Sequence, residues 1–144
     1  APSSLTRLHD LGVQPFLTAA TILGVLAQRL VRRLCPHCKQ QTAINEQEWE
    51  HLTFDYMMDM PTTMYKAVGC EACRQTGYKG RVGIYEFMPV SLELKSIIGG
   101  NGTLDNLRAQ AKKEGIEPLR IAGARKVIEG VTTLEEVLRV VPLS

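Results

Sequence analysis

The four cysteines of this sequence form two pairs, Cys35 with Cys38 and Cys70 with Cys73. Two residues separate the members of each pair, and about thirty residues separate the pairs. This spacing lets each pair turn both sulfurs toward one point, as a tetrahedral Zn²⁺ ion requires. Four thiolates close the coordination sphere and leave no position for water or substrate. The pattern therefore predicts one structural zinc ion per chain and argues against zinc catalysis.

Other uses of these residues are less consistent with the spacing. Two disulfides would suit a secreted domain, but we expect no signal peptide, and tight pairs are more typical of metal ribbons. A thioredoxin-like redox site requires a single pair at a helix N-terminus, which two matched pairs fit poorly. His37 lies inside the first pair and could replace a cysteine only by straining the loop, so we expect it to be an exposed loop residue.

Length and composition exclude several classes of protein. With 144 residues, 44% of them hydrophobic, the chain is long enough for one globular domain or two small lobes. A net charge of +2 is too small to indicate a nucleic-acid-binding or membrane-surface protein by bulk electrostatics. The longest apolar run, residues 16–27, is shorter than a membrane-spanning helix. We therefore expect a globular protein that is not integral to a membrane.

The elements before and after the cysteines must bring the two pairs together. A helix over residues 1–11, with Leu5, Leu8 and Leu11 on its buried side, is expected to end before Gly12. Residues 16–28 are apolar on nearly every face and predict a second helix packed inside a larger domain.

A strand over residues 29–34 is predicted to lead into Cys35. A second strand, residues 82–87, follows the second cysteine pair and should pair with the first. Both cysteine pairs would then lie at the open end of one hairpin. Residues 35–73 would form an inserted module that is too small to fold without its metal.

Within this insert, Asn45 is predicted to cap a helix of about three turns, with Ile44 placed to pack against Trp49. The methionine-rich residues 57–60 could form a plastic binding surface, but we favour a role as gap filler in a small core. Residues 64–68 are expected to form a strand that delivers Cys70 to the metal.

The remaining residues predict a bundle of three or four short helices. Thr103 is expected to cap one helix, which stops at Gly115 and Ile116, and Thr132 with Glu135 is expected to cap the last helix. Charges alternate over the outer face of these helices, which is typical of a solvated surface, so we expect no chemistry from the bundle alone.

Three stretches of the sequence, LGVLAQRLVRRLCPHC, GCEACRQTGYKGRVGIYEFMPV and EGVTTLEEVLRV, resemble the C-terminal part of type II secretion and type IV pilus assembly ATPases. The resemblance runs from Ala1 to about Val140 and implies an α/β fold, a fragment of a RecA-like P-loop ATPase domain. It implies three parts: the end of the RecA-like domain (residues 1–34 and 74–90), a tetracysteine zinc module (residues 35–73) and a C-terminal helical bundle (residues 91–144).

The family resemblance also implies the setting in which the protein works. The parent would be a homo-oligomer, a hexameric motor, that uses ATP and Mg²⁺ to drive protein secretion or pilus assembly. It would be cytoplasmic, peripherally associated with the inner membrane, and would act on inner-membrane platform proteins, with no nucleic acid expected as a partner. The sequence resembles a fragment that begins just after the family's histidine box.

The phosphate-binding loop of such an ATPase is not part of this sequence. A Walker A loop needs a glycine followed by lysine and then by serine or threonine, so that the lysine and the hydroxyl reach the phosphates and Mg²⁺. No glycine of this sequence is followed by lysine. We therefore expect that this portion does not hydrolyse ATP alone.

Arg81 is the one candidate for a nucleotide contact, and two interpretations of it stay open. It lies between glycines in GYKGRVG, where a guanidinium can approach phosphate oxygens, and the resemblance implies that this arginine faces the nucleotide. The alternative is that Arg81 only offsets the negative charge of a four-cysteine zinc site, together with Arg32, Arg33, Arg74 and Lys79. A zinc ribbon that serves as an interaction or nucleic-acid-binding module, without a catalytic role, is the alternative function.

Overall fold

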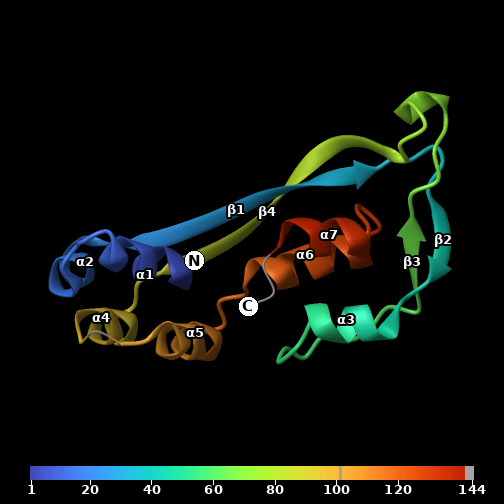
Figure 1. Ribbon diagram of the computed structural model, residues 1–144. Coiled ribbons are helices and arrows are strands. Elements are labelled where there is room, and N and C mark those ends of the chain that lie inside the picture. The colour runs from blue at the N-terminus through green and yellow to red at the C-terminus, as the bar shows by residue number, and fades with distance from the viewer. Residues whose placement is uncertain (101, 142–144) are drawn as a thin grey trace. The chain divides into compact units, whose positions relative to one another are not determined.

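The computed structural model describes residues 1–100 and 102–141, and Figure 1 shows the order of its elements. The described elements are α1 (Pro2–Asp10), α2 (Pro15–Thr21), β1 (Gly24–Leu34), β2 (Gln40–Ala43), α3 (Glu46–Leu52), β3 (Thr63–Lys66), the 3₁₀ helix η1 (Glu71–Cys73), β4 (Tyr78–Pro89), α4 (Leu92–Gly99), α5 (Leu104–Lys113), α6 (Leu119–Ile128) and α7 (Leu134–Val140). The described part of the chain is therefore mixed α/β, as predicted, while a RecA-like parent fold stays a prediction. Residues 101 and 142–144 of the expected bundle lie outside the described residues.

The long ribbon of β1 and β4 confirms the predicted strand pair. Hydrogen bonds from Val90 N–H to the Leu23 carbonyl (3.0 Å) and from Cys35 N–H to the Gly77 carbonyl (2.9 Å) flank the pair and show that the strands run antiparallel. The helix expected over residues 16–28 is wrong beyond Thr21, because β1 begins at Gly24. Short apolar runs fit a buried strand as well as a buried helix, which is why the pattern did not separate them.

The chain divides into two compact units, and each is built from two separate stretches. Unit 1 contains residues 1–27 and 85–118, and unit 2 contains residues 28–84 together with the chain from Leu119 onward. Both β1 and β4 contribute residues to each unit. Of the helices after β4, α4 and α5 belong to unit 1, and α6 and α7 belong to unit 2. The three-part domain division stays a prediction.

Unit 1 has a core in which α1, α4 and α5 pack with β4. The buried side chains of this core include Leu5, Met88, Leu94, Ile98 and Leu107. The expected buried stripe of the first helix is only partly correct, because Leu11 is 71% exposed.

The caps of α4 and α5 are side-chain oxygens that accept backbone N–H groups at the start of each helix. Ser91 Oγ accepts the Leu94 N–H at 3.1 Å, and Thr103 Oγ1 accepts the Asn106 N–H at 3.2 Å, as expected for Thr103. The Schellman stop after α5 is confirmed, since the Ile116 N–H reaches the Ala111 carbonyl at 3.0 Å and Gly115 has a φ of 82°.

Unit 2 contains a pair of short strands, with β2 before α3 and β3 after it. Strands β2 and β3 pair antiparallel with Gln40 opposite Lys66 and Ala43 opposite Thr63. Asn45 caps α3 as predicted, its Oδ1 accepting the Glu48 N–H at 3.1 Å, and Trp49 and Leu52 are buried. The helix has only seven residues, about two turns rather than three.

The cap of α7 is one residue later than expected. Thr133, not Thr132, accepts the N–H of Glu136, at 3.0 Å. The Thr132 hydroxyl instead donates to the Arg32 carbonyl at 2.8 Å. Because of this shift, Glu136 rather than Glu135 lies on the buried side of α7, and only 1% of Glu136 is exposed.

None of the helices in the described part of the chain combines the length and the apolar character needed to cross a membrane.

Candidate metal centre

The sulfur atoms of Cys35, Cys38, Cys70 and Cys73 form one cluster in unit 2. All four Sγ atoms lie within 4.8 Å of one another. The separations between Cys35 and Cys70, Cys38 and Cys73, and Cys70 and Cys73 are each 3.8 Å. Four sulfurs placed about 2.3 Å from a central Zn²⁺ ion in a tetrahedron would be about 3.8 Å apart. The cluster therefore has the dimensions of a zinc site with four cysteine ligands, and the separations are too long for disulfides, which need about 2.05 Å.

Two glycines let the backbone turn closely around the sulfurs. Gly69 and Gly77 have φ values of 118° and 83°, which favour glycine. A Cβ atom on Gly77 would lie 2.5 Å from the Ala67 Cβ, and one on Gly69 would lie 2.8 Å from the Gln75 carbonyl oxygen. The second cysteine pair is thus held in a turn that side chains at these two positions would disrupt.

Backbone N–H groups point at the sulfurs and favour ionised cysteines. Burial opposes ionisation of Cys73, but the N–H groups of Cys70 and Gly77 donate to its Sγ at 3.2 Å each and lower its pKa to about 6. The N–H of Gly69 favours the Cys38 thiolate in the same way, but burial and the neighbouring sulfurs raise the pKa of Cys38 to about 11.

The close spacing of the four sulfurs favours a cation among them. Four sulfurs this close repel one another when ionised, so they do not all carry a charge without a cation among them. A divalent metal ion supplies that charge and deprotonates coordinating thiols. Cysteine thiolates are ligands that Zn²⁺ prefers, so the residues fit the predicted ion. Among the described residues the cluster contains cysteines only, and His37 is exposed as expected.

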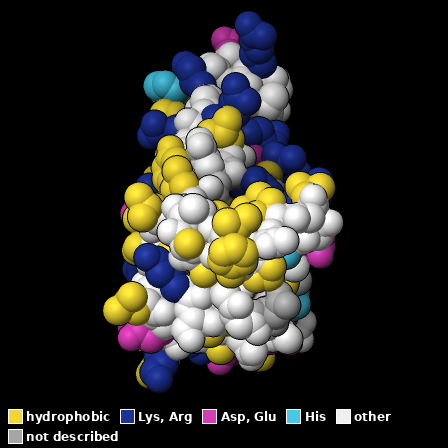
Figure 2. Space-filling view, turned by 90° about the vertical axis from the view of Figure 1, so that its left-hand side faces the viewer, with side chains coloured by type: hydrophobic (Ala, Val, Ile, Leu, Met, Phe, Trp, Pro, Cys, Tyr) yellow, Lys and Arg dark blue, Asp and Glu magenta, His cyan; other side chains and the backbone are white. Residues whose placement is uncertain are grey.

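A basic groove lies beside the first cysteine pair and contains Arg81. Its volume is about 450 Å³. Figure 2 shows Lys and Arg side chains gathered at the upper end of the view, the level at which Figure 1 draws the turn with η1. The side chains that line the groove include Arg33, His37, Lys39, Lys79, Arg81 and Glu129.

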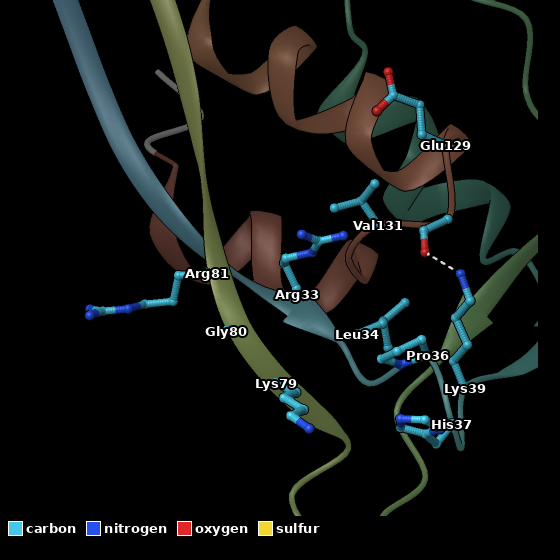
Figure 3. A pocket seen from close by; sticks show the side chains of 11 residues that line it. Arg33, Leu34, Pro36, His37, Lys39, Lys79, Gly80, Arg81, Glu129 and Val131 are labelled. Carbon is cyan, nitrogen blue, oxygen red and sulfur yellow. Dashed lines mark hydrogen bonds between the residues drawn. The ribbon is translucent and has the colours of Figure 1, made fainter. Parts of the chain in front are cut away.

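Within this groove, Arg81 differs from its neighbours in direction. Figure 3 shows its side chain pointing away from those of Arg33 and His37, and the residue is exposed. Lys39, by contrast, is hydrogen-bonded within the chain, since its Nζ donates to the Gly130 carbonyl at 2.9 Å. Arg81 is therefore positioned to contact a group outside the groove.

A second charged cluster, which we call the Glu136 cluster, joins β1 to α7 and was not predicted. We define it as Arg32, Tyr78, Thr133, Glu136 and Arg139. Arg32 donates to the Glu136 carboxylate from its backbone N–H (2.7 Å), Nε (3.1 Å) and Nη2 (3.2 Å), and Arg139 donates from Nε (2.9 Å) and Nη2 (3.0 Å). The Arg32 guanidinium also lies 4.1 Å from the centre of the Tyr78 ring, and the Tyr78 hydroxyl hydrogen-bonds Thr133 at 2.8 Å.

These bonds fix the charge state of Glu136. Burial opposes ionisation of Glu136, but the hydrogen bonds from Arg139 and Arg32 lower its pKa to about 2. Arg32 is thus paired with Glu136, and its proposed part in offsetting the charge of the cysteines stays a prediction. The sequence signal that could have revealed the cluster was the i, i+3 spacing of Glu136 and Arg139 on the last helix.

Comparison with known proteins gives consistent matches over nearly the whole chain. The model of a family described as "Type II/IV secretion system protein" matches residues 1–139. Similar proteins include the type IV pilus assembly ATPase TfpB of Acinetobacter baylyi (69% identical over 144 residues), the type II secretion system protein E of Pseudomonas aeruginosa (45% over 140) and the type IV pilus assembly ATPase PilB of Thermus thermophilus (39% over 138).

These alignments include little of the relatives' own length. They span 100%, 97% and 96% of this chain but only 25%, 27% and 16% of the three relatives, respectively. The chain thus corresponds to about a quarter or less of each.

Proposed function

Because this chain belongs to the family of type II/IV secretion system proteins, we propose that it is the C-terminal, zinc-binding portion of a hexameric motor ATPase that drives protein export or pilus assembly. The observation that carries the proposal is the 69% identity over all 144 residues to a type IV pilus assembly ATPase. In the complete protein, the Walker A loop that binds the phosphates of ATP and Mg²⁺ would be supplied by the rest of the chain, so this portion does not hydrolyse ATP alone.

The zinc site has a structural role in this proposal. Cys35, Cys38, Cys70 and Cys73 hold the ion, and a bound Zn²⁺ supplies positive charge and a fixed geometry. Because four thiolates complete the tetrahedron, substrate has no access to the metal. The ion then holds the two turns together at the end of β1 and β4, and so positions the start of β4.

Arg81 is the residue of this portion that we propose for nucleotide contact. Its exposure and its direction away from the groove support the proposal. A guanidinium aimed at phosphate oxygens stabilises charge that develops during phosphoryl transfer. We place the working motor in the cytoplasm, peripherally at the inner membrane, where its ATP cycle would act on platform proteins.

The decisive experiment compares two arginine variants in the complete protein. Arg81→Ala is expected to lower ATP turnover on the order of 10³-fold while zinc content and oligomer size stay unchanged. Arg33→Ala removes the same charge from the groove and is the matched control, with turnover near that of the wild type. If Arg81→Ala retains wild-type turnover, Arg81 is a charge-balancing residue and this part of the proposal is wrong.

A further inference from the structure

A second groove of unit 2 lies beside α3 and is separate from the cysteine cluster. Its volume is about 400 Å³, within the range of sites that bind ligands or inserted side chains. Its lining combines apolar and acidic side chains and consists of Glu46, Trp49, Glu50, Thr53, Phe54, Asp55, Tyr56, Met58 and Met60.

The apolar lining of this groove is left open to solvent. Phe54 is 71% exposed and Met60 is 41% exposed, and the neighbouring Met57 is fully exposed. The expectation that the methionine-rich stretch fills a core is therefore wrong. Methionine is flexible and polarizable, and with aromatic residues it is enriched where proteins bind partners.

Trp49 provides an unused hydrogen-bond donor at the same place. Only 2% of the residue is exposed, and its Nε1 has no hydrogen-bond partner among the described residues. A buried tryptophan N–H normally finds an acceptor. Trp49 is also one of the residues that line the groove.

The charged side chains at the rim of the groove determine which ligand charge the groove favours. Glu46 and Glu50 are exposed and lie one turn apart on α3. No Lys or Arg is among the described residues that line the groove. The rim therefore attracts a cationic segment and repels an anionic lipid surface.

Contacts with α6 hold the groove in shape. The Arg120 guanidinium donates to the Leu52 carbonyl at 2.8 Å and lies 5.0 Å from the centre of the Tyr56 ring. The segment after α3 is thus tied to a second helix, which lowers the entropic cost of binding.

We propose that this groove binds a basic amphipathic segment of a partner protein. An apolar side chain of the segment inserts beside Trp49, Phe54 and Met58. Its Lys or Arg residues face Glu46 and Glu50. This inference goes beyond the motor function and does not depend on it.

Trp49 is the only tryptophan of the chain, so its fluorescence tests the proposal directly. The probe is a synthetic amphipathic helical peptide of leucine and lysine that carries no aromatic residue. Titration of the zinc-loaded chain is expected to change the Trp49 emission to saturation. A peptide with glutamate in place of lysine is expected to bind at least about tenfold more weakly.

Charge-reversed variants separate a specific rim from general electrostatics. Glu46→Lys with Glu50→Lys is expected to weaken binding of the basic peptide at least about tenfold. The matched control is Glu93→Lys with Glu135→Lys, which changes the net charge equally at exposed positions in the first turns of α4 and α7. This control is expected to bind as the wild type does.

Met60→Ser tests the apolar lining without changing charge, and it is expected to weaken binding severalfold. Zinc content and circular dichroism check that every variant is folded. Equal binding of both peptides, equal loss in the control pair, or no emission change with the basic peptide would overturn the proposal. It would also be overturned if phosphatidylserine vesicles alone caused the larger emission change, or if the groove variants abolished self-association of the chain.

Discussion

The cysteine cluster and the Glu136 cluster both contain groups in unit 2 that can carry negative charge, but the partners of these groups differ. Glu136 is buried and receives five hydrogen bonds from Arg32 and Arg139. The cysteine sulfurs accept backbone N–H groups from Gly69, Cys70 and Gly77, and among the described residues no arginine or lysine hydrogen-bonds to them. The charge of Glu136 is balanced by arginines of the chain itself, whereas the cysteine cluster has the composition and dimensions of a site that could hold a metal ion.

Unit 2 therefore contains one cluster that is stabilised by its own ionised side chains and another that we expect to be stabilised by a bound metal ion. The Glu136 cluster joins β1 to α7 through side chains that are charged at neutral pH, because the pKa of Glu136 is about 2. We expect the cysteine turns to depend on metal supply, since metal-binding free energy is also folding free energy for such sites. We therefore expect metal loss to affect residues 35–73 far more than the contact between β1 and α7.

The largest effect should follow from breaking the cysteine cluster. Cys70→Ser is expected to reduce the zinc content from about one ion per chain to none, and to disorder residues 35–73, because apparent zinc-binding free energies in such peptides are roughly 10–16 kcal/mol. Elemental analysis measures the ion, and amide hydrogen exchange measures local order.

His37→Ala is the control for this variant, since it changes the same loop without removing a sulfur. The His37→Ala variant should keep its zinc content and the slow amide hydrogen exchange of residues 35–73. A metal-free chain that retains full protection over residues 35–73 would contradict the assignment of these cysteines to a metal.

The second largest effect should come from Glu136→Gln. Removing one partner of a buried ion pair leaves the remaining charges uncompensated, and the free energy of unfolding is expected to fall by about 3 kcal/mol. Urea unfolding of the zinc-loaded chain gives this value. The exposed neighbour Glu135→Gln is the matched control and should change it by less than about 0.5 kcal/mol.

Acid pH provides a second measurement on the same variant. The pKa of Glu136 is lowered from 4.5 to about 2, so its stabilising effect is present above 4.5 and is lost as the pH falls toward 2. Metal loss affects both proteins, so the difference between wild type and Glu136→Gln is the relevant quantity. That difference should shrink over this interval, and a constant difference would contradict the pKa shift.

The smallest effect should be the difference in stability between alanine substitutions at Gly77 and at Gly80. Both have positive φ values, 83° and 79°, but a Cβ on Gly77 would lie 2.5 Å from the Ala67 Cβ, whereas one on Gly80 would meet nothing within 4 Å. Gly80→Ala is expected to cost about 1 kcal/mol from backbone strain alone, and Gly77→Ala about 2–3 kcal/mol. Zinc competition with a chromophoric chelator should show weaker binding only in Gly77→Ala. Equal effects would mean that close packing at Gly77 does not support the cysteine turn.

Local sequence patterns predicted the features that depend on a few neighbouring residues. The spacing of the cysteines predicted their cluster, and Asn45 and Thr103 predicted helix starts through their own side-chain oxygens. The strand pair followed from alternation around the cysteines.

Features set by distant contacts could not be predicted in this way. Glu136 is buried because it meets Arg32, which is 104 positions away in sequence. The choice between Thr132 and Thr133 as a cap depends on the same contact, since Thr132 bonds the Arg32 carbonyl. Met57 has a side chain suited to a core, but its exposure depends on which elements pack beside it.

The division of the chain into interleaved stretches has a consequence for its synthesis. On a ribosome, the four cysteines emerge well before α6 and α7, so the metal site can assemble while Glu136 is still unmade. Unit 1 closes only after residues 85–118 return to the first helices, and unit 2 closes last, when α7 arrives. Capture of a metal ion by the cysteines can therefore precede formation of the Glu136 cluster during synthesis.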